Sequence, residues 1–322
     1  MKIAFFDTKP YDKEPFLRAA KGSGVDIHFY ETRLCEDTVE LAHGYDGVCV
    51  FVNDTVNAAV IDRLYAYGVR VIALRCAGYN NVDARHAAGK LSVLRVPAYS
   101  PHAVAEHAMA MLLTSVRRIH KAYNRTRDFN FSLNGLAGFD LHGKTVGVIG
   151  TGRIGRAFID ICRGFGMNVY GYDKYPAANA EGFRYVSLEK IFCESDVISL
   201  HCPLTEDTYH LISRANIEKM KKGVVIVNTS RGALIDAEAL LDGIKARKIG
   251  AACLDVYEEE SELFFEDFSG HILDDDTLAR LISMPNVLVT SHQAFLTNEA
   301  LRNIAETTIQ NLTAPVAENF VR

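Results

Sequence analysis

Three polar segments, each directly after an apolar strand-like run, carry the residue types that could do acid–base chemistry in this chain. They begin at Asn228, Asp255 and Ser291. In an open α/β sheet the carboxyl ends of parallel strands border one crevice, so such segments can meet around one ligand. They would bring together an arginine, an acidic run and a histidine: Arg231, Glu258–Glu262 and His292.

These residue types suit the reduction of a 2-keto acid. Such a substrate carries a carboxylate beside a carbonyl, and Arg231 can offer its planar fork of donors to both. A hydride that reaches the carbonyl carbon leaves an oxygen that needs a proton, and histidine is the residue type that exchanges protons near neutral pH. A carboxylate on the other imidazole nitrogen would orient the ring of His292, and we assign this role to Glu260.

Taken singly, each of these residues has a commoner explanation. An arginine after a strand often makes a surface ion pair, an acidic run is usually a solvated loop, and a lone histidine is more often structural. Their joint appearance at predicted strand ends, beyond a nucleotide-binding turn, favours the catalytic interpretation of Arg231, Glu260 and His292.

The nucleotide-binding turn is the glycine-rich stretch Gly150–Gly155. The apolar run Val146–Ile149 precedes it and a helical stretch, Arg156–Arg163, follows it. A lone G-x-G-x-x-G pattern is weak, but a strand before it and a helix after it give it meaning. The free N–H groups at the start of the helix attract phosphate, so this stretch predicts a dinucleotide site.

The three glycines and a later aspartate indicate which dinucleotide the site would bind. Gly150 would permit the tight turn, Gly152 would let a pyrophosphate approach the backbone, and Gly155 would let helix and strand pack closely. Asp173 ends the next apolar run, near the offset of about 20 residues that the motif requires. A carboxylate there accepts hydrogen bonds from ribose hydroxyls and repels a 2′-phosphate. We therefore expect NAD rather than NADP, although the neighbouring Lys174 could soften the preference.

Apolar runs alternate with helical stretches along the whole chain, which predicts an α/β fold with parallel sheets. In the first third, strands are expected over Lys2–Phe6, Gly47–Val52 and Val69–Leu74, with a helix over Thr55–Tyr67. A long helix is expected from His102 to about Tyr123. The pattern then restarts with six further strand candidates: Thr145–Ile149, Val169–Tyr172, Val197–Leu200, Val224–Asn228, Ile249–Leu254 and Val287–Thr290.

Composition limits the class of protein. A chain of 322 residues suggests two domains, and its net charge of −5 argues against nucleic acid as a partner. No apolar run approaches the ~20 residues that span a bilayer, and the N-terminus has no signal-peptide plan. The seven scattered cysteines show no zinc spacing and indicate free thiols, so we expect a cytoplasmic protein without a metal site.

Together these residues make the chain resemble the D-2-hydroxyacid dehydrogenases, most closely their bacterial fermentative D-lactate dehydrogenase branch. The resemblance runs essentially from end to end. Its most specific stretches are Arg75–Asp83, Val96–His107, Val148–Gly155, Ile198–Thr205, Val227–Asp236 and Ser291–Thr297.

The resemblance implies roles that spacing alone does not assign. Arg231, Glu260 and His292 match the family's catalytic residues, Ala77 and Gly78 match amides that hold the substrate carboxylate, and Tyr99 matches a tyrosine at the substrate. Phe51 and Phe295 would wall off the substrate's methyl group. The positions that match NAD contacts, besides the glycine turn and Asp173, are Arg153, Ile154, Cys202, Pro203, Thr229, Ser230 and Asp255.

The resemblance also implies a domain plan and an assembly. A Rossmann domain for NAD, residues 100–296, would be inserted into a flavodoxin-like substrate domain made of residues 1–99 and 297–322. The tail from Asn298 to Phe320 would then pack back on the first third. The family pairs subunits through the cofactor domain, so we expect a homodimer or homotetramer.

Three functions remain open at this point. The first is the reversible reduction of pyruvate to D-lactate by NADH. The second keeps the chemistry but takes a larger 2-keto acid such as 2-ketoisocaproate or phenylpyruvate. The third is a non-enzymatic, NAD-sensing protein like the corepressors related to this family, which the presence of Arg231, Glu260 and His292 disfavours.

Overall fold

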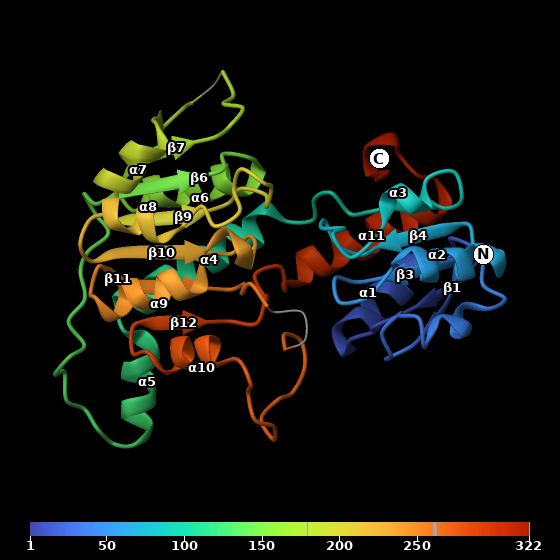
Figure 1. Cartoon of the computed structure of the whole chain (residues 1–322), viewed down its shortest axis with the longest axis horizontal. Helices are drawn as coiled ribbons and strands as arrows, with labels where there is room; N and C mark the ends of the chain where they lie inside the picture. The colour runs from blue at the N-terminus through green and yellow to red at the C-terminus, as the bar shows by residue number, and fades with distance from the viewer. Residues whose placement is uncertain (179, 260–262, 322) are drawn as a thin grey trace. The chain divides into compact units, whose positions relative to one another are not determined.

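The computed structural model describes residues 1–178, 180–259 and 263–321. The chain forms two compact units, one made of Met1–Ser100 with Phe295–Arg322 and the other of Pro101–Ala294. Each unit has its own parallel sheet covered by helices (Figure 1). The predicted α/β class with two parallel-sheet units is confirmed.

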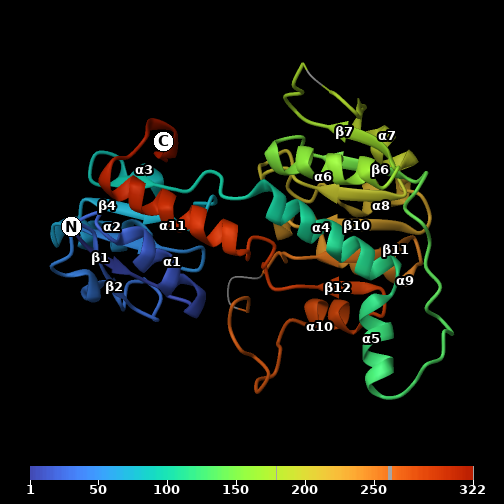
Figure 2. The same ribbon diagram turned by 180° about the vertical axis from the view of Figure 1, so that it is seen from behind.

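The first unit holds a five-stranded parallel sheet in the order β2-β1-β3-β4-β5, which is the flavodoxin-like order. Its strands are β1 (Lys2–Phe5), β2 (Asp26–Phe29), β3 (Gly47–Val50), β4 (Val71–Leu74) and β5 (Ser92–Leu94). Its helices are α1 (Pro10–Ala20), η1 (Val39–Ala42), α2 (Ala58–Ala66), α3 (Ala84–Ala87), α11 (Asn298–Thr313) and η4 (Ala317–Asn319). Helix α11 packs against α1 and β4, so the predicted return of the tail to the first third is confirmed (Figure 2).

The second unit holds a seven-stranded parallel sheet in the order β12-β11-β10-β9-β6-β7-β8. Read from β8 to β11 this is the 3-2-1-4-5-6 order of dinucleotide-binding sheets, with β12 added at one edge. The strands are β6 (Thr145–Ile149), β7 (Asn168–Tyr172), β8 (Arg184–Tyr185), β9 (Val197–Leu200), β10 (Val224–Asn228), β11 (Ile249–Leu254) and β12 (Val287–Val289).

Helices cover both faces of this second sheet. Figure 2 shows α4 (Pro101–Val116) across one face, where it packs against α6 (Arg153–Gly164). The opposite face carries α7 (Leu188–Glu194), α8 (Arg214–Lys219), α9 (Ala237–Lys245) and α10 (Asp276–Ser283). The remaining elements are α5 (Ile119–Arg127) and the 3₁₀ turn η2 (Gly232–Leu234).

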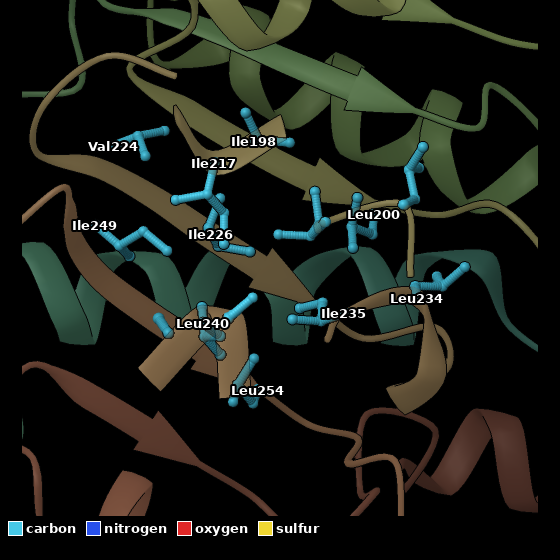
Figure 3. Packing of buried hydrophobic residues seen from close by; sticks show 14 of the residues in the cluster. Ile198, Leu200, Ile217, Val224, Ile226, Leu234, Ile235, Leu240, Ile249 and Leu254 are labelled. Carbon is cyan, nitrogen blue, oxygen red and sulfur yellow. The ribbon is translucent and has the colours of Figure 1, made fainter. Parts of the chain in front are cut away.

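Burial on both faces explains why the central strands read as unbroken apolar runs. Every residue of β9 and β10 is buried. Figure 3 shows Ile198, Leu200 and Ile226 of this sheet packed against Ile217 of α8 and Leu240 of α9. Each fully buried aliphatic side chain of this kind contributes about 1.5–3 kcal/mol to the free energy of unfolding, so this cluster fixes where the strand ends lie.

One predicted element is wrong, and three strands were not predicted. The helix expected from His102 to about Tyr123 is interrupted, because α4 ends at Val116 and Arg118 adopts a left-handed backbone with φ 55° before α5 begins. Gly138 lies against the Val116 carbonyl, where an added Cβ would come within 1.9 Å of the oxygen. Strands β2, β5 and β8 were not expected, since β5 and β8 are very short and no residue of β2 is fully buried.

Candidate active site

The glycine turn joins β6 to α6, and two of its glycines are required by close backbone contacts. Gly150 has φ +93°, and a Cβ there would lie 2.5 Å from the His201 carbonyl oxygen. A Cβ on Gly155 would lie 2.0 Å from the carbonyl oxygen of Gly150. The first glycine therefore permits the turn, and the third lets helix α6 approach it.

The second glycine borders open space. Gly152 caps α6, and a Cβ added to it would meet no heavy atom within 4 Å. Helix α6 carries no acidic residue in its first turn, whose unpaired N–H groups and partial positive charge favour an anion. Arg153 and Ile154 are the first two residues of this helix, exposed and half-buried respectively. The residues present therefore fit a pyrophosphate.

Asp173 follows β7 and is fixed beside the turn. Its carboxylate accepts hydrogen bonds from the Thr151 amide (2.8 Å), the Thr151 hydroxyl (3.1 Å) and the Tyr175 amide (3.0 Å). Lys174 forms an ion pair with Asp207. Lys174, the cation that could favour a 2′-phosphate, is thus paired with a carboxylate other than Asp173.

Beneath the turn lies His201, directly after β9. Its ring packs 5.0 Å from that of Phe158, and its Nε2 lies 2.8 Å from the hydroxyl of Ser199. Burial lowers the pKa of His201 to about 3, so the ring is neutral at physiological pH. This histidine supports the turn and is not a proton donor near neutral pH.

The loops after β9 and β10 carry further residues that are expected to contact NAD. The Ser230 hydroxyl donates to the Cys202 carbonyl (2.6 Å), which ties the two loops together beside the exposed Pro203. The Thr229 hydroxyl is buried, and no hydrogen-bond partner for it exists among the described residues. A buried polar atom without a partner is costly, so Thr229 fits a site that a polar ligand completes.

Arg231 sits on a turn organised by a fully buried asparagine. Asn228, the last residue of β10, donates from Nδ2 to the Arg231 carbonyl (2.8 Å) and accepts from the Ser230 amide (3.1 Å). The guanidinium of Arg231 donates to the Ser230 carbonyl (2.6 Å). The sequence places Asn228 at the start of the polar segment but indicates no role for it, whereas the structure shows that it holds the Arg231 turn.

The acidic run approaches this turn through backbone packing. A Cβ on Gly232 would lie 2.0 Å from the Tyr257 carbonyl carbon, so the loops after β10 and β11 are in contact. Glu258 accepts from the Tyr209 hydroxyl (3.3 Å) and lies 2.8 Å from Nε2 of His210. Glu260, the predicted partner of the catalytic histidine, lies outside the described residues.

His292 lies on the loop after β12, and Asp255 holds that loop. The Asp255 side chain accepts from the Thr290 hydroxyl (2.6 Å) and the amides of Gln293 (3.0 Å) and Ala294 (2.9 Å). Its carbonyl accepts from the His292 amide (2.7 Å). His292 has a left-handed backbone with φ 52°, a conformation that persists only where surrounding bonds over-determine it.

The charge of Asp255 is stabilised although the residue is fully buried. Burial alone raises the pKa of a carboxyl group, but hydrogen bonds from His107, Thr290 and the Ala294 amide hold the pKa of Asp255 below its ordinary value. Nε2 of His107, on α4, lies 3.3 Å from the carboxylate. Since Asp255 also donates its amide to the Asn228 carbonyl (2.9 Å), the Arg231 and His292 loops share one buried polar network.

In the first unit, the expected substrate wall is an aromatic cluster. The Phe295 ring lies 6.1 Å from that of Phe51 and 6.4 Å from that of Tyr99, measured between centroids. Tyr11, at the start of α1, joins the cluster 6.3 Å from Phe295. Tyr11 was missed because it is far from the family's diagnostic stretches, and nothing in its local sequence points to a site.

Ala77 and Gly78 form a bend after β4, half-buried, with both carbonyls occupied. The Ala77 carbonyl accepts from Arg95 (2.9 Å) and the Gly78 carbonyl accepts from the Cys76 thiol (3.2 Å). Within the described part of the chain, the amides of Gly78 and Tyr79 donate to no protein group. Adjacent unpaired amides form a concavity that suits an anion.

Comparisons with known proteins accord with this geometry. A sequence model of the family described as D-isomer specific 2-hydroxyacid dehydrogenase, NAD binding domain, matches residues 109–294. The chain belongs to this family.

Among relatives of this 2-hydroxyacid dehydrogenase is the D-lactate dehydrogenase of Escherichia coli, which is 54% identical over 97% of this chain and 96% of its own length. A solved structure of the apo D-lactate dehydrogenase from Escherichia coli superposes with a TM-score of 0.91 at 50% identity, covering 100% of both chains. A structure of D-2-hydroxyisocaproate dehydrogenase gives a TM-score of 0.88 at 33% identity, covering 100% of this chain and 99% of that one.

The family assignment confirms the predicted enzyme class and the NAD cofactor. The dehydrogenase has elements suited to binding the cofactor and elements suited to binding the substrate. Its second unit carries the glycine turn, Arg231 and His292 at the ends of strands of one sheet, β6, β10 and β12, and its first unit carries an amide bend and an aromatic cluster. Among the residues that the structure describes, no cluster of three or more His, Cys, Asp or Glu could hold a metal ion.

Proposed function

We propose that this dehydrogenase catalyses the reversible reduction of pyruvate to D-lactate with NADH. The observation that carries the proposal is the buried network of Asn228 and Asp255, which links the Arg231 loop after β10 to the His292 loop after β12, in the same sheet as the glycine turn. The 54% identity to a D-lactate dehydrogenase over nearly the full chain supports pyruvate as the substrate.

Each catalytic residue has one task in this proposal. NADH supplies the hydride to the carbonyl carbon. Arg231 holds the carboxylate and polarises the carbonyl with its planar fork of donors. His292 delivers the proton to the carbonyl oxygen in reduction and takes it back in oxidation. Glu260 orients the His292 ring and stabilises its charged form.

For the cofactor, we propose that Asp173 binds the ribose hydroxyls and makes NAD preferred over NADP. The ion pair between Lys174 and Asp207 supports this preference, because it places a second carboxylate beside the cation next to Asp173. The positions proposed to contact NAD are Gly150, Gly152, Arg153, Ile154, Gly155, Asp173, Cys202, Pro203, Thr229, Ser230 and Asp255.

For the substrate, we propose that the amides at Ala77 and Gly78 hold its carboxylate, while Phe51, Tyr99 and Phe295 surround its methyl group. The Phe295 ring lies 6.1 Å from that of Phe51 and 6.4 Å from that of Tyr99, and a wall of such bulky rings favours a substrate with a small side chain, which supports pyruvate. The second candidate, a larger 2-keto acid, is supported by the similarity to D-2-hydroxyisocaproate dehydrogenase.

The domain roles follow the same division. We propose that residues 1–99 and 297–322 form the substrate domain and that residues 100–296 form the NAD domain. The two compact units, which divide after Ser100 and before Phe295, support this plan.

We propose that the enzyme is a homodimer or a dimer of dimers. The arm after α4, residues 119–140, is exposed and polar overall but carries large apolar side chains, with Phe129 83%, Phe131 72% and Leu133 79% exposed. Large apolar side chains that cluster on a surface usually mark a protein interface. We propose that the segment His102–Tyr123, which forms α4 and the start of α5, contributes to the same subunit contact.

We propose the cytoplasm as the site of action. The support is the set of seven free cysteines, five of them buried, which is typical of a reducing compartment. No helix in the described ranges is long and apolar enough to cross a membrane. Immunodetection in fractionated cells of the source organism tests this proposal, and recovery with secreted proteins contradicts it.

The stereochemistry of the product tests the proposed reaction. Purified enzyme is incubated with pyruvate and NADH, and the lactate formed is separated by chiral chromatography. We expect D-lactate in large excess. L-lactate, a racemic mixture or an absence of lactate would each contradict the proposal.

A further inference from the structure

The amide bend of the first unit is held from behind by a cation that no catalytic role accounts for. Arg95 directly follows β5, and its Nη1 donates to the carbonyl of Ala77 (2.9 Å). Its guanidinium also stacks over the ring of Tyr79, 5.3 Å from the centroid. The Arg95 side chain therefore contacts two of the three residues of the bend Ala77–Tyr79.

The hydrogen bond from Arg95 to the Ala77 carbonyl fixes the direction of the Gly78 amide hydrogen. In a trans peptide the C=O and N–H bonds point in opposite directions. The Ala77 carbonyl belongs to the same peptide unit as the Gly78 amide, so the bond from Arg95 turns the Gly78 N–H away from Arg95. The thiol of Cys76 donates to the Gly78 carbonyl (3.2 Å), which shares a peptide unit with the Tyr79 amide. This bond therefore turns the Tyr79 N–H away from Cys76. Neither amide donates to another group among the described residues.

A cation on the carbonyl also strengthens the amide as a donor. Hydrogen bonds on the two ends of a peptide unit polarise each other, and those made by a charged group are about twice as strong as neutral ones. Arg95 therefore makes the Gly78 N–H a better donor to an anion, while its own charge adds a favourable field.

The C-terminal tail in turn holds Arg95. The Arg95 amide donates to the Asn319 carbonyl (2.9 Å), and its carbonyl accepts from the side chain of Asn311 (2.9 Å). The two asparagines are buried and bonded to each other, Nδ2 of Asn319 to Oδ1 of Asn311 at 2.7 Å. The Arg95 backbone is thus anchored on both sides by α11 and η4.

We propose that Arg95 is a positioning residue for substrate binding, which orients and polarises the Gly78 amide so that it receives the carboxylate of the 2-keto acid. The inference rests on the proposed function, in which the Ala77–Gly78 bend holds that carboxylate. Because such a contact is made equally in the bound substrate and in the transition state, its loss raises the KM for pyruvate and leaves kcat at saturation nearly unchanged.

The test compares Arg95→Met with Arg70→Met. Arg70 is a matched control in the same unit, because its Nη1 also donates to a backbone carbonyl, that of Val69 (3.0 Å), and it stacks over Tyr65 at 5.5 Å. The probe is oxamate, the unreactive amide analogue of pyruvate, titrated into the enzyme–NADH complex and followed by the fluorescence of bound NADH. Pyruvate KM, kcat and the Kd of NADH are measured in parallel.

We expect Arg95→Met to raise the oxamate Kd and the pyruvate KM about tenfold, the factor that corresponds to one charged hydrogen bond. NADH affinity and kcat should stay within about threefold, and Arg70→Met should match the wild type. If Arg95→Met does not fold, Arg95→Lys is measured. We expect a smaller rise there, because lysine keeps the positive charge and loses only the planar guanidinium that stacks over Tyr79.

The outcomes separate the inference from the proposed function. An oxamate Kd unchanged in Arg95→Met, or in Arg95→Lys where that variant replaces it, overturns the role of Arg95 while pyruvate reduction stands. A wild-type protein that binds oxamate but reduces no pyruvate contradicts the proposed function alone. A wild-type protein that does not bind oxamate contradicts both.

Discussion

At the level of single residues, the side chains proposed to carry the chemistry lie on loops held by buried polar neighbours. His292 adopts a left-handed backbone and bonds through its amide to the carbonyl of Asp255. Arg231 follows a turn that Asn228 ties from within. Both holding residues are fully buried, so their hydrogen bonds to the loops are shielded from water.

His292→Gln tests the proton donor. Glutamine keeps a polar side chain of similar length but cannot carry the proton, so kcat for pyruvate should fall by a factor of about 10² to 10⁴. The Kd of NADH should change little, since the proposed role of His292 is proton transfer and not cofactor binding. Steady-state kinetics and NADH fluorescence titration provide both values, and His271→Gln, a change at an exposed histidine, is the control. Normal turnover in His292→Gln would exclude the assigned role.

The residue types of the site could be predicted, but their supports could not. Arg231 and His292 follow strand ends and carry obvious chemistry, so pattern and resemblance single them out. Asn228 ends a buried strand, and only tertiary contacts show that its amide serves the next turn. Tyr11 lies outside the family's diagnostic stretches, and only the packing around Phe295 brings it to the aromatic cluster.

At the level of elements, the strand–turn–helix around Gly150–Gly155 joins fold and function. The turn sits where β6 passes into α6 against the loop after β9, and two of its glycines are excluded from carrying a side chain by backbone atoms. The same close packing that stabilises the second unit therefore shapes the phosphate site.

Gly155→Ala tests this coupling, with Gly164→Ala in the same helix as its control. An alanine Cβ at position 155 would meet the Gly150 carbonyl oxygen at 2.0 Å, whereas at position 164 it would meet nothing within 4 Å. We expect Gly155→Ala to lower the melting temperature and to weaken NADH binding by at least tenfold. Gly164→Ala should be neutral or more stable by up to about 1 kcal/mol. Thermal melts and NADH titration measure both effects, and equal behaviour of the two variants would contradict the close-packing account.

The strongly patterned elements were predictable and the short ones were not. Buried strands such as β9 and β10 appear as apolar runs because helices cover both faces of their sheet. Strand β8 has two residues, and its pairing with β7 depends on contacts that no local pattern records. The break between α4 and α5 likewise depends on Gly138, which packs against the end of α4 from 22 residues further along the chain.

At the level of the whole molecule, the arm of residues 119–140 exposes large apolar side chains, which a partner subunit would cover. Phe129 and Phe131 are mostly exposed and lie just after α5. We expect the double variant Phe129→Asp/Phe131→Asp to shift the enzyme to a smaller assembly, because charges in a desolvated interface are costly. Light scattering coupled to gel filtration measures the mass, and Ile282→Asp, at an exposed position on α10, should not change it. A wild-type mass equal to one 35.7 kDa chain would contradict the oligomer proposal.

The chain is an NAD-dependent D-2-hydroxyacid dehydrogenase, and we propose that its aromatic cluster selects pyruvate. The most direct test is kcat/KM for pyruvate, 2-ketoisocaproate and phenylpyruvate, each measured with NADH and with NADPH on the same preparation. We predict the highest value for pyruvate with NADH, and values at least tenfold lower for both the larger acids and NADPH. A higher kcat/KM for a branched or aromatic 2-keto acid would contradict the substrate assignment, and equal use of NADPH would contradict the role of Asp173.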